Sequence, residues 1–154
     1  MSRSYNRPPV PKIGEIYMMK FTGHGSAQAG WRPGVIFQNN IGNRYSPNVI
    51  ALPLTSSLKK LGQPTHIVIR AADSGLRQDS MVLCENPVII SKENLGAYIT
   101  RLSDEYMRRI TIGYLLASSA ISYLDSNSLL DVWRNAAVMN DRQVIFEESA
   151  APPI

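Results

Sequence analysis

Two arginines and a group of turn-forming residues crowd one short stretch of the chain, residues 25–47. The stretch reads GSAQAGWRPGVIFQNNIGNRYSP, and Arg32 and Arg44 flank its single apolar run. A guanidinium group can bond two oxygens of one anion, and glycine lets a backbone approach a ligand closely. The stretch therefore predicts either an awkward hairpin or a loop that holds a charged ligand.

The basic residues are concentrated in the first half of the chain, although the net charge of +4 is modest. Residues 1–72 hold nine lysines and arginines and one acidic residue, whereas residues 73–154 hold seven basic and eleven acidic ones. Clustered lysines and arginines attract phosphates, so the asymmetry fits a polyanionic partner. It fits a solvated basic face equally well, and charge alone leaves both alternatives open.

Cysteine and histidine are too few for the common metal and thiol sites. The one cysteine, Cys84, lies inside the apolar run SMVLCE, where we expect a buried core thiol rather than a nucleophile. His24 and His66 make no metal-ligand spacing with it, so we expect neither a metal nor another cofactor. No apolar run approaches a membrane-spanning length, and no hydrophobic signal core follows the N-terminus. We therefore expect a soluble, cytoplasmic protein with no membrane contact.

The elements that must position the arginines follow a proline-rich lead at residues 1–12. Prolines lack the backbone donor that a helix or a central strand needs, so this lead is expected to be flexible. Six short runs rich in Val and Ile come next, at 15–21, 34–38, 48–54, 66–70, 80–84 and 87–90. Regular short strands without intervening helices indicate a mainly β domain, a small closed or half-open barrel.

Helical periodicity replaces the strand pattern after residue 91. Residues 91–98 predict a short helix, and residues 103–121 predict a longer one with Ser103 as its N-cap. The longer helix should pack on the barrel through apolar residues that recur on roughly one face. These residues are Met107, Ile110, Tyr114 and Ile121.

Residues 13–124 then form one domain, and residues 125–154 form a C-terminal extension. The extension predicts a second helix over about 128–139, which contains Trp133, followed by a flexible acidic tail. We expect this helix to pack on the barrel rather than to cover a binding groove.

An ordered set of motifs resembles the MazF/PemK family of toxin endoribonucleases. The set comprises G-S-x-Q, G-x-R-P, Q-N-x-I-G-N-R-x-S-P, L-T-S, K-K with P-T-H, G-L-x-x-D-S and L-S-D-E-x-M, and it runs from about Gly14 to about Ala120. The resemblance implies a small SH3-like β-barrel of the type shared with the gyrase-inhibiting CcdB toxins, with a C-terminal helix packed on it. It also implies a homodimer that cuts single-stranded RNA without a metal and that a small antitoxin silences.

The resemblance gives three residues catalytic roles. Arg32 falls on the arginine of the G-x-R-P turn and would stabilise charge on phosphorus, while Pro33 keeps its backbone extended. Thr55 falls on the threonine at the end of the third strand and would hold a phosphate oxygen. Glu85 falls where relatives carry an acidic residue and would take the proton of the ribose 2′-hydroxyl or orient a base.

Further polar residues are candidates to bind RNA, and two departures from the family pattern accompany them. Two loop positions of the usual G-S-E-Q-G-G are Ala27 and Ala29 here, and Val88 stands where relatives often carry an arginine. The two adjacent lysines read equally well as a phosphate-steering pair or as a solvated pair, and for the asparagines at 39–43 we favour a structural role. The candidate RNA-binding residues are Ser26, Gln28, Arg44, Ser56, Lys59 and Lys60.

Two other functions stay open. A toxin of the same fold could act without catalysis by trapping DNA gyrase, which would survive the loss of Arg32 and Thr55. An RNA-binding module could keep its affinity for RNA but lose turnover, which would show as binding without cleavage.

Overall fold

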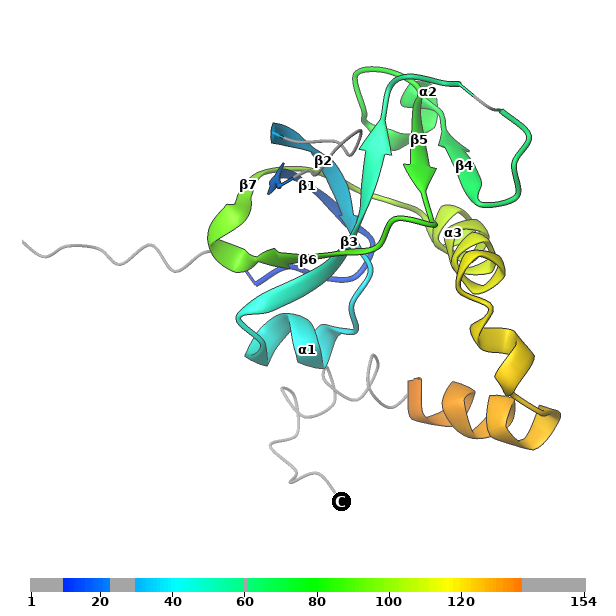
Figure 1. The fold of residues 1–154 in the computed structure, drawn as a ribbon. Coiled ribbons are helices and arrows are strands. Elements are labelled where there is room, and N and C mark those ends of the chain that lie inside the picture. Colours follow the sequence, from blue (N-terminus) through cyan, green and yellow to red (C-terminus); the bar gives the residue numbers. More distant parts are fainter. Residues whose placement is uncertain (1–9, 23–29, 60, 137–154) are drawn as a thin grey trace, which may run out of the picture.

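Figure 1 shows the computed structural model, which describes residues 10–22, 30–59 and 61–136. The strands are β1 (Glu15–Phe21), β2 (Gly30–Ile36), β3 (Asn48–Thr55), β4 (His66–Ile69), β5 (Ser80–Leu83), β6 (Val88–Ser91) and β7 (Leu95–Arg101). The helices are α1 (Asn40–Tyr45), α2 (Ala71–Ser74) and α3 (Asp104–Ser118), with 3-10 turns η1 (Lys92–Asn94) and η2 (Ala120–Tyr123). The six predicted strands are confirmed, and β2 begins four residues before the predicted run.

The strands form one antiparallel sheet in the order β4-β5-β3-β2-β1-β7, with β6 paired to β3 as well. The central strand β3 changes partner along its length, because Asn48–Ala51 pairs with β6 whereas Leu54 and Thr55 pair with β5. Within the described residues the end strands β4 and β7 do not pair, so the sheet is open. The expectation of a mainly β fold is confirmed. Of the closed and half-open barrels that the sequence predicted as alternatives, the closed one is wrong.

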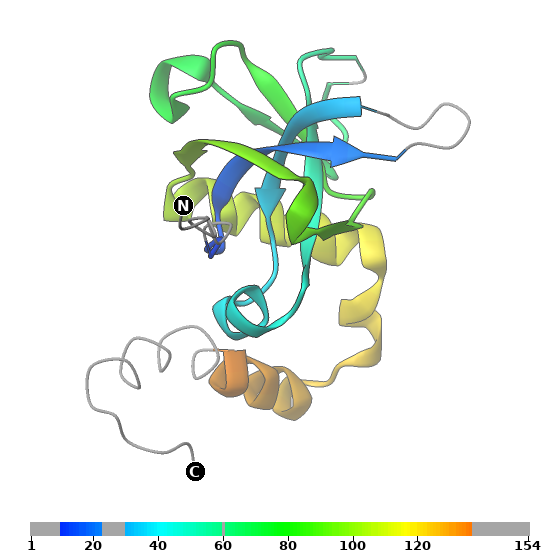
Figure 2. The same ribbon diagram turned by 90° about the vertical axis from the view of Figure 1, so that its left-hand side faces the viewer.

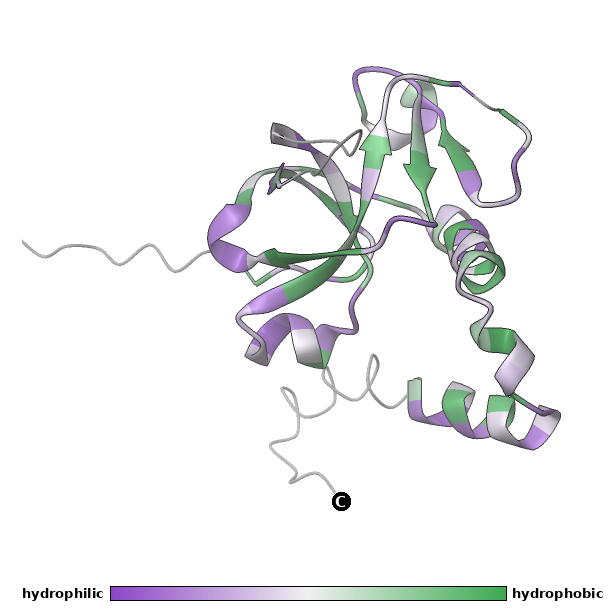
Figure 3. Cartoon of the chain, in the orientation of Figure 1, coloured by the Kyte–Doolittle hydropathy of each residue, from purple (hydrophilic) through white to green (hydrophobic). Residues whose placement is uncertain are grey.

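The helix α3 covers the end of the sheet where the barrel does not close. Ser103 caps it, with its Oγ accepting the Tyr106 N–H at 3.3 Å, and Tyr106 and Ile110 pack in one buried cluster with Ile67 of β4. This arrangement buries the apolar residues of β4 without an eighth strand. Figure 3 shows the corresponding concentration of apolar residues along the strands.

The predicted apolar face of α3 is confirmed for most of its length. Ile110 is fully buried, and Met107 and Tyr114 pack against the same cluster. The prediction for Ile121 is wrong, because Ser119 adopts a left-handed conformation (φ 58°) that ends the helix and leaves Ile121 exposed in η2. Cys84 is buried in the same core, as expected, and its burial raises the pKa of the thiol to about 12.

The helix predicted at 91–98 is wrong. Ser91 does cap a helical turn, since its Oγ accepts the Glu93 N–H at 3.4 Å, but the turn is only η1 and the chain then enters β7. Strand β7 pairs with β1, and a Cβ on its Gly96 would lie 3.0 Å from the Trp31 ring. The missing side chain therefore lets Trp31 lie against β7, a tertiary contact that the local sequence pattern does not reveal.

The extension is helical over residues 126–136, and its continuation lies outside the described residues. Figure 2 shows this helix beyond the α1 end of the sheet. Its apolar side chains are exposed, including Leu130, Val132 and Trp133, the last at 70%. The expectation that this helix packs on the sheet is therefore not met in the described part of the chain. None of the helices described is both long and apolar enough to cross a membrane.

Candidate active site

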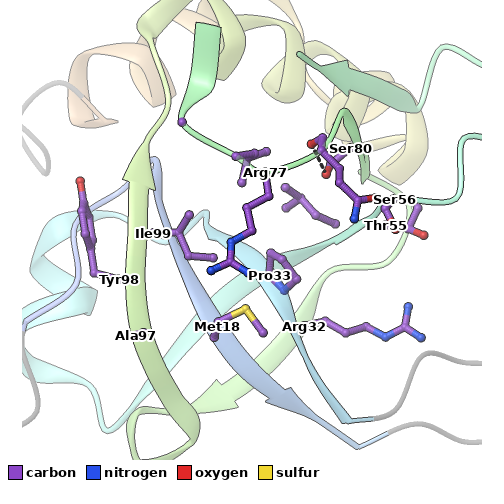
Figure 4. Close-up of a pocket in the computed structure, with 14 residues that line it drawn as sticks. Met18, Arg32, Pro33, Thr55, Ser56, Arg77, Ser80, Ala97, Tyr98 and Ile99 are labelled. Atoms are coloured by element: carbon purple, nitrogen blue, oxygen red, sulfur yellow. Dashed lines mark hydrogen bonds between the residues drawn. The ribbon is translucent and has the colours of Figure 1, made fainter. Parts of the chain in front are cut away.

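A cleft of about 780 Å³ opens where β2 and β3 diverge. Its walls come from β1, β2, β3, β7 and the loop between α2 and β5 (Figure 4). Among the described residues, two arginines line it and no aspartate or glutamate does. The lining residues are Met18, Arg32, Pro33, Leu54, Thr55, Ser56, Gly75, Leu76, Arg77, Gln78, Ser80, Ala97, Tyr98 and Ile99. Such a lining suits an anion with apolar parts.

Two prolines stand at the point where the strands diverge. Strands β2 and β3 pair only from Gly34 opposite Pro53 to Ile36 opposite Ala51. Pro33 comes next on β2, where its nitrogen faces Leu54 of β3 in the alternation set by the Phe37 N–H that donates to the Ile50 carbonyl, and it has no N–H with which to extend the ladder. Beyond this fork β3 keeps its pairing with β5 on the opposite edge and no longer pairs with β2, so the cleft lies between the freed ends of β2 and β3.

The fork brings Arg32 and Thr55 to the same cleft, as their predicted roles require. Arg32 is half-buried on β2 opposite Met19 of β1, and no hydrogen bond or ion pair joins its side chain to another described residue. Figure 4 shows the Arg32 side chain extending along the cleft below Thr55 and Ser56. Its guanidinium group is therefore available to a ligand.

The hydroxyl of Thr55 is fixed by the turn that follows β3. The side chain is 9% exposed, and its Oγ1 accepts the N–H of Ser57 at 3.1 Å. Because this bond occupies a lone pair, the hydroxyl proton remains free to be donated into the cleft. Thr55 can therefore donate a hydrogen bond to an oxyanion, and the exposed Ser56 lies beside it.

The loop between α2 and β5 supplies lining residues that the sequence analysis did not single out, above all Arg77. Gly75 ends α2 with φ +80°, which suits glycine, and Ser80 donates its hydroxyl to the Gln78 carbonyl at 3.0 Å. Arg77 and Gln78 occupy the two variable positions of G-L-x-x-D-S. The flanking motif marked a turn, and it gave no signal that the variable positions face the cleft.

Asp79 holds this loop in place. Its Oδ1 accepts the Ala71 N–H at 2.8 Å and its Oδ2 accepts from Arg70 Nη1 at 3.0 Å. The bond to Ala71 and then the bond to Arg70 lower the pKa of the Asp79 carboxyl below its ordinary value. The carboxylate is therefore ionised at neutral pH, and both of its oxygens serve the scaffold.

Glu85 does not reach the cleft, so its predicted role as a base receives no support from this chain's geometry. Ser80 at one end of β5 lines the cleft, whereas Glu85 follows the other end, where its Oε1 lies 2.6 Å from His66 Nε2. A strand rises about 3.3 Å per residue, so the two ends of β5 are roughly 10 Å apart. The motif placed Glu85 after a strand without showing which end of that strand faces the site.

The remaining candidates for RNA binding divide into three groups. Ser56 lines the cleft. Arg44 lies on α1 over the Tyr45 ring, 5.6 Å from its centroid, and Lys59 is exposed in the loop after β3, so neither is among the lining residues. Ser26, Gln28 and Lys60 lie outside the described residues, as do Ala27, Ala29 and His24.

The asparagines at 39–43 are structural, as favoured. Asn39 caps α1 by accepting the Gly42 N–H at 2.9 Å, and Asn40 accepts the Ile13 N–H at 2.8 Å. Asn43 is fully buried and donates to the Gln38 carbonyl at 2.8 Å. Within the described part of the stretch at 25–47, Arg32 and Pro33 line the cleft and the asparagines anchor α1.

Metal-ligand geometry is absent from the described part of the chain. Within residues 10–22, 30–59 and 61–136, no three His, Cys, Asp or Glu side chains are grouped so that they could hold a metal ion.

Comparisons with known proteins agree with the fold and with the motifs. Residues 12–113 match the family described as PemK-like, MazF-like toxin of type II toxin-antitoxin system. The chain is 35% identical over 115 residues to Endoribonuclease EndoA of Bacillus subtilis (strain 168), across 74% of this chain and 99% of that protein. It is 38% identical over 98 residues to Endoribonuclease MazF of Staphylococcus saprophyticus, across 63% of this chain and 82% of that protein.

Solved structures share the fold. The crystal structure of MazF from Deinococcus radiodurans matches with a TM-score of 0.63 and 18% identity, over 72% of this chain and 98% of that one. An endoribonuclease from a mycobacterial species, solved in complex with its cognate antitoxin, matches with a TM-score of 0.60 and 24% identity, over 71% and 96%. The chain belongs to the PemK-like, MazF-like toxin family, and the resemblance seen in its motifs is confirmed.

Proposed function

We propose that this protein is an endoribonuclease that cleaves single-stranded RNA and acts as the toxin of a toxin–antitoxin pair. Its relatives in Bacillus and Staphylococcus carry the name endoribonuclease at 35% and 38% identity. The observation that carries the proposal is the convergence of Arg32 and Thr55 on one cleft whose described lining residues include no acidic one. A cleft of this charge favours a phosphodiester over a neutral or cationic substrate.

In the proposed reaction RNA supplies its own nucleophile. The 2′-oxygen of the ribose attacks the neighbouring phosphorus, and the bond from phosphorus to the 5′-oxygen breaks. The products are a 2′,3′-cyclic phosphate and a 5′-hydroxyl end. The protein must align these atoms and stabilise the negative charge that builds on the non-bridging oxygens.

Arg32 and Thr55 meet the electrostatic part of this requirement. The guanidinium of Arg32 can donate two hydrogen bonds to the phosphate, and the Thr55 hydroxyl can donate one to an oxygen of the same group. The described lining contains neither a carboxylate nor a histidine. The 2′-hydroxyl proton therefore passes to water or to a group outside this lining, and the leaving oxygen takes up a proton.

The partners proposed for this chain follow from its family. The mycobacterial relative was solved with its cognate antitoxin, and we propose an antitoxin partner here as well. We also propose that the protein works as a cytoplasmic homodimer without a cofactor. The gyrase-trapping and binding-only alternatives are less favoured, since the named relatives are endoribonucleases.

The proposal is tested by incubating the protein with mixed single-stranded RNA in the presence of a chelator and sequencing the ends. The wild type should generate 5′-hydroxyl ends at a short preferred sequence, and Arg32→Ala should generate almost none. Equal numbers of ends from both proteins, or none from either, would overturn the proposal. Gyrase trapping that persists in Arg32→Ala would then support the non-catalytic alternative.

A further inference from the structure

Arg77 is a second arginine in the cleft, and the proposed reaction gives it no role. It lies in the loop between α2 and β5, and in Figure 4 its side chain extends across the cleft toward Pro33. The side chain is exposed, and it forms no hydrogen bond or ion pair with another described residue. Its positive charge therefore faces the cleft without a protein partner in the described part of the chain.

The nearest acidic residue in the sequence forms no ion pair with Arg77. Asp79 is two residues away, but its two oxygens bond Ala71 and Arg70, as described above. Some other exposed arginines have acidic partners: Arg70 pairs with Asp79, and Arg134 lies 3.8 Å from Asp131. Arg77 thus differs from these surface arginines in both its position and its lack of compensation.

The backbone on both sides of Arg77 is anchored. Leu76 is buried in the core, and its N–H donates to Ser74 Oγ at 3.3 Å. On the other side, Ser80 is buried and bonds the Gln78 carbonyl. A long side chain that starts from a fixed backbone loses less freedom when it binds a ligand, so the anchoring favours a binding role.

We propose that Arg77 binds a second phosphate of the RNA, adjacent to the scissile phosphate held by Arg32 and Thr55. This inference rests on the proposed function. A strand that crosses the cleft from the β2–β3 fork to the α2–β5 loop presents one phosphate to each wall. The enzyme then favours oligonucleotides that carry a charged linkage next to the cleaved one, and Arg77 sets this substrate requirement.

The first test measures binding and does not depend on cleavage. A mixed-sequence single strand with 2′-deoxyribose throughout cannot react by the proposed route, and its dissociation constant is measured at several salt concentrations. Arg77→Ala should weaken binding about tenfold at low salt, as expected for one charge-assisted hydrogen-bonded contact. It should also reduce the slope of log K against log[salt] by about 0.7, the value for one lost phosphate contact on a single strand.

Arg134→Ala is the matched control, because it removes the same charge from a residue on the exposed helix at 126–136. It should leave both quantities at the wild-type value. If Arg77→Ala and Arg134→Ala give the same slope, the second phosphate site is wrong even if the protein cleaves RNA. If their slopes differ as expected while no RNA is cleaved, the site stands and the proposed function fails.

The second test locates the phosphate. In an oligonucleotide with a mapped cleavage sequence and one 2′-deoxy nucleotide at the cut, each flanking phosphate in turn is replaced by a neutral methylphosphonate. The wild type should lose about tenfold in affinity at one of these positions, and Arg77→Ala should lose nothing further there. Equal losses for both proteins at both positions would overturn the proposal.

Discussion

The two ends of β5 differ in how the polar and charged side chains around them are paired. At the Glu85 end, the carboxylate lies 2.6 Å from the ring of His66, and the thiol of Cys84 is buried beside it. At the Ser80 end, Arg77 and Arg32 line a cleft to which the described part of the chain contributes no acidic residue. Compensated groups stabilise the scaffold, whereas uncompensated charge remains available to a ligand. This difference separates the candidate site from the structural end of the same strand.

Substitution of Arg32 should have the largest effect on RNA cleavage, because both the charge and the two parallel donors of its guanidinium group would bind the phosphate. Arg32→Lys keeps the charge but loses the two parallel donors, so we expect the rate of RNA cleavage to fall at least about 100-fold. The measurement is the single-turnover rate on a short RNA at saturating protein. A Lys variant within a few fold of the wild type would mean that only the charge matters. Unfolding by urea should be unchanged, since Arg32 bonds no other described residue.

Thr55 should give the next largest effect. Thr55→Val keeps the shape of the side chain but removes the hydroxyl donor, and we expect the cleavage rate to fall about 10- to 100-fold. Thr55→Ser retains the donor and should recover most of that loss. The lost bond from the Ser57 N–H would loosen the turn in Thr55→Val alone. Equal rates for Val and Ser would show that the hydroxyl takes no part.

Asp79 should affect the reaction through the position of Arg77. Asp79→Ala removes both anchors of the loop, and we expect RNA affinity to fall about three- to tenfold. In Asp79→Asn the side chain can still accept the Ala71 N–H, so RNA affinity should fall less. The readout is the salt slope of binding, because a loop that no longer presents Arg77 should behave like Arg77→Ala. An affinity loss with an unchanged slope would contradict this positioning role.

The smallest effect on cleavage should come from the structural end of β5. Glu85→Gln can keep a hydrogen bond to His66 but loses the charge, and we expect cleavage within about threefold of the wild type. The free energy of unfolding should fall by about 1 kcal/mol or less, because the hydrogen bond to His66 loses its charged acceptor. Both are measured on the same preparation, by urea unfolding and by single-turnover cleavage. A 100-fold loss of cleavage without loss of stability would restore Glu85 to the active site.

Sequence motifs identified cleft residues where the motif contains the functional side chain itself. Arg32 and Thr55 were identified from their motifs, and the structure brings them to one cleft. Arg77 was missed because it occupies a variable position, and only the tertiary fold shows that the α2–β5 loop faces the β2–β3 fork. Glu85 was misplaced for a related reason, since a residue that follows a strand in sequence can lie at the end remote from the site.

Long-range contacts that the local sequence does not reveal also limited the prediction of secondary structure. The six strands predicted from Val- and Ile-rich runs were confirmed because the pattern of burial is local. The first residues of β7 were predicted as part of a helix over 91–98, because the pairing with β1 and the Trp31 contact at Gly96 are long-range and leave no local signal. The sequence left open whether the barrel closes, because it does not show that α3 covers β4.

The fork at Pro33 and Pro53 has a consequence for the empty enzyme. Adjacent antiparallel strands usually pair along their whole length. A cleft between them would then have to be opened each time a substrate binds. Here Pro33 has no amide hydrogen to donate to β3, so the next bond of the β2–β3 ladder cannot form. The cleft is therefore open before the substrate binds, and none of the binding energy is used to separate the two strands.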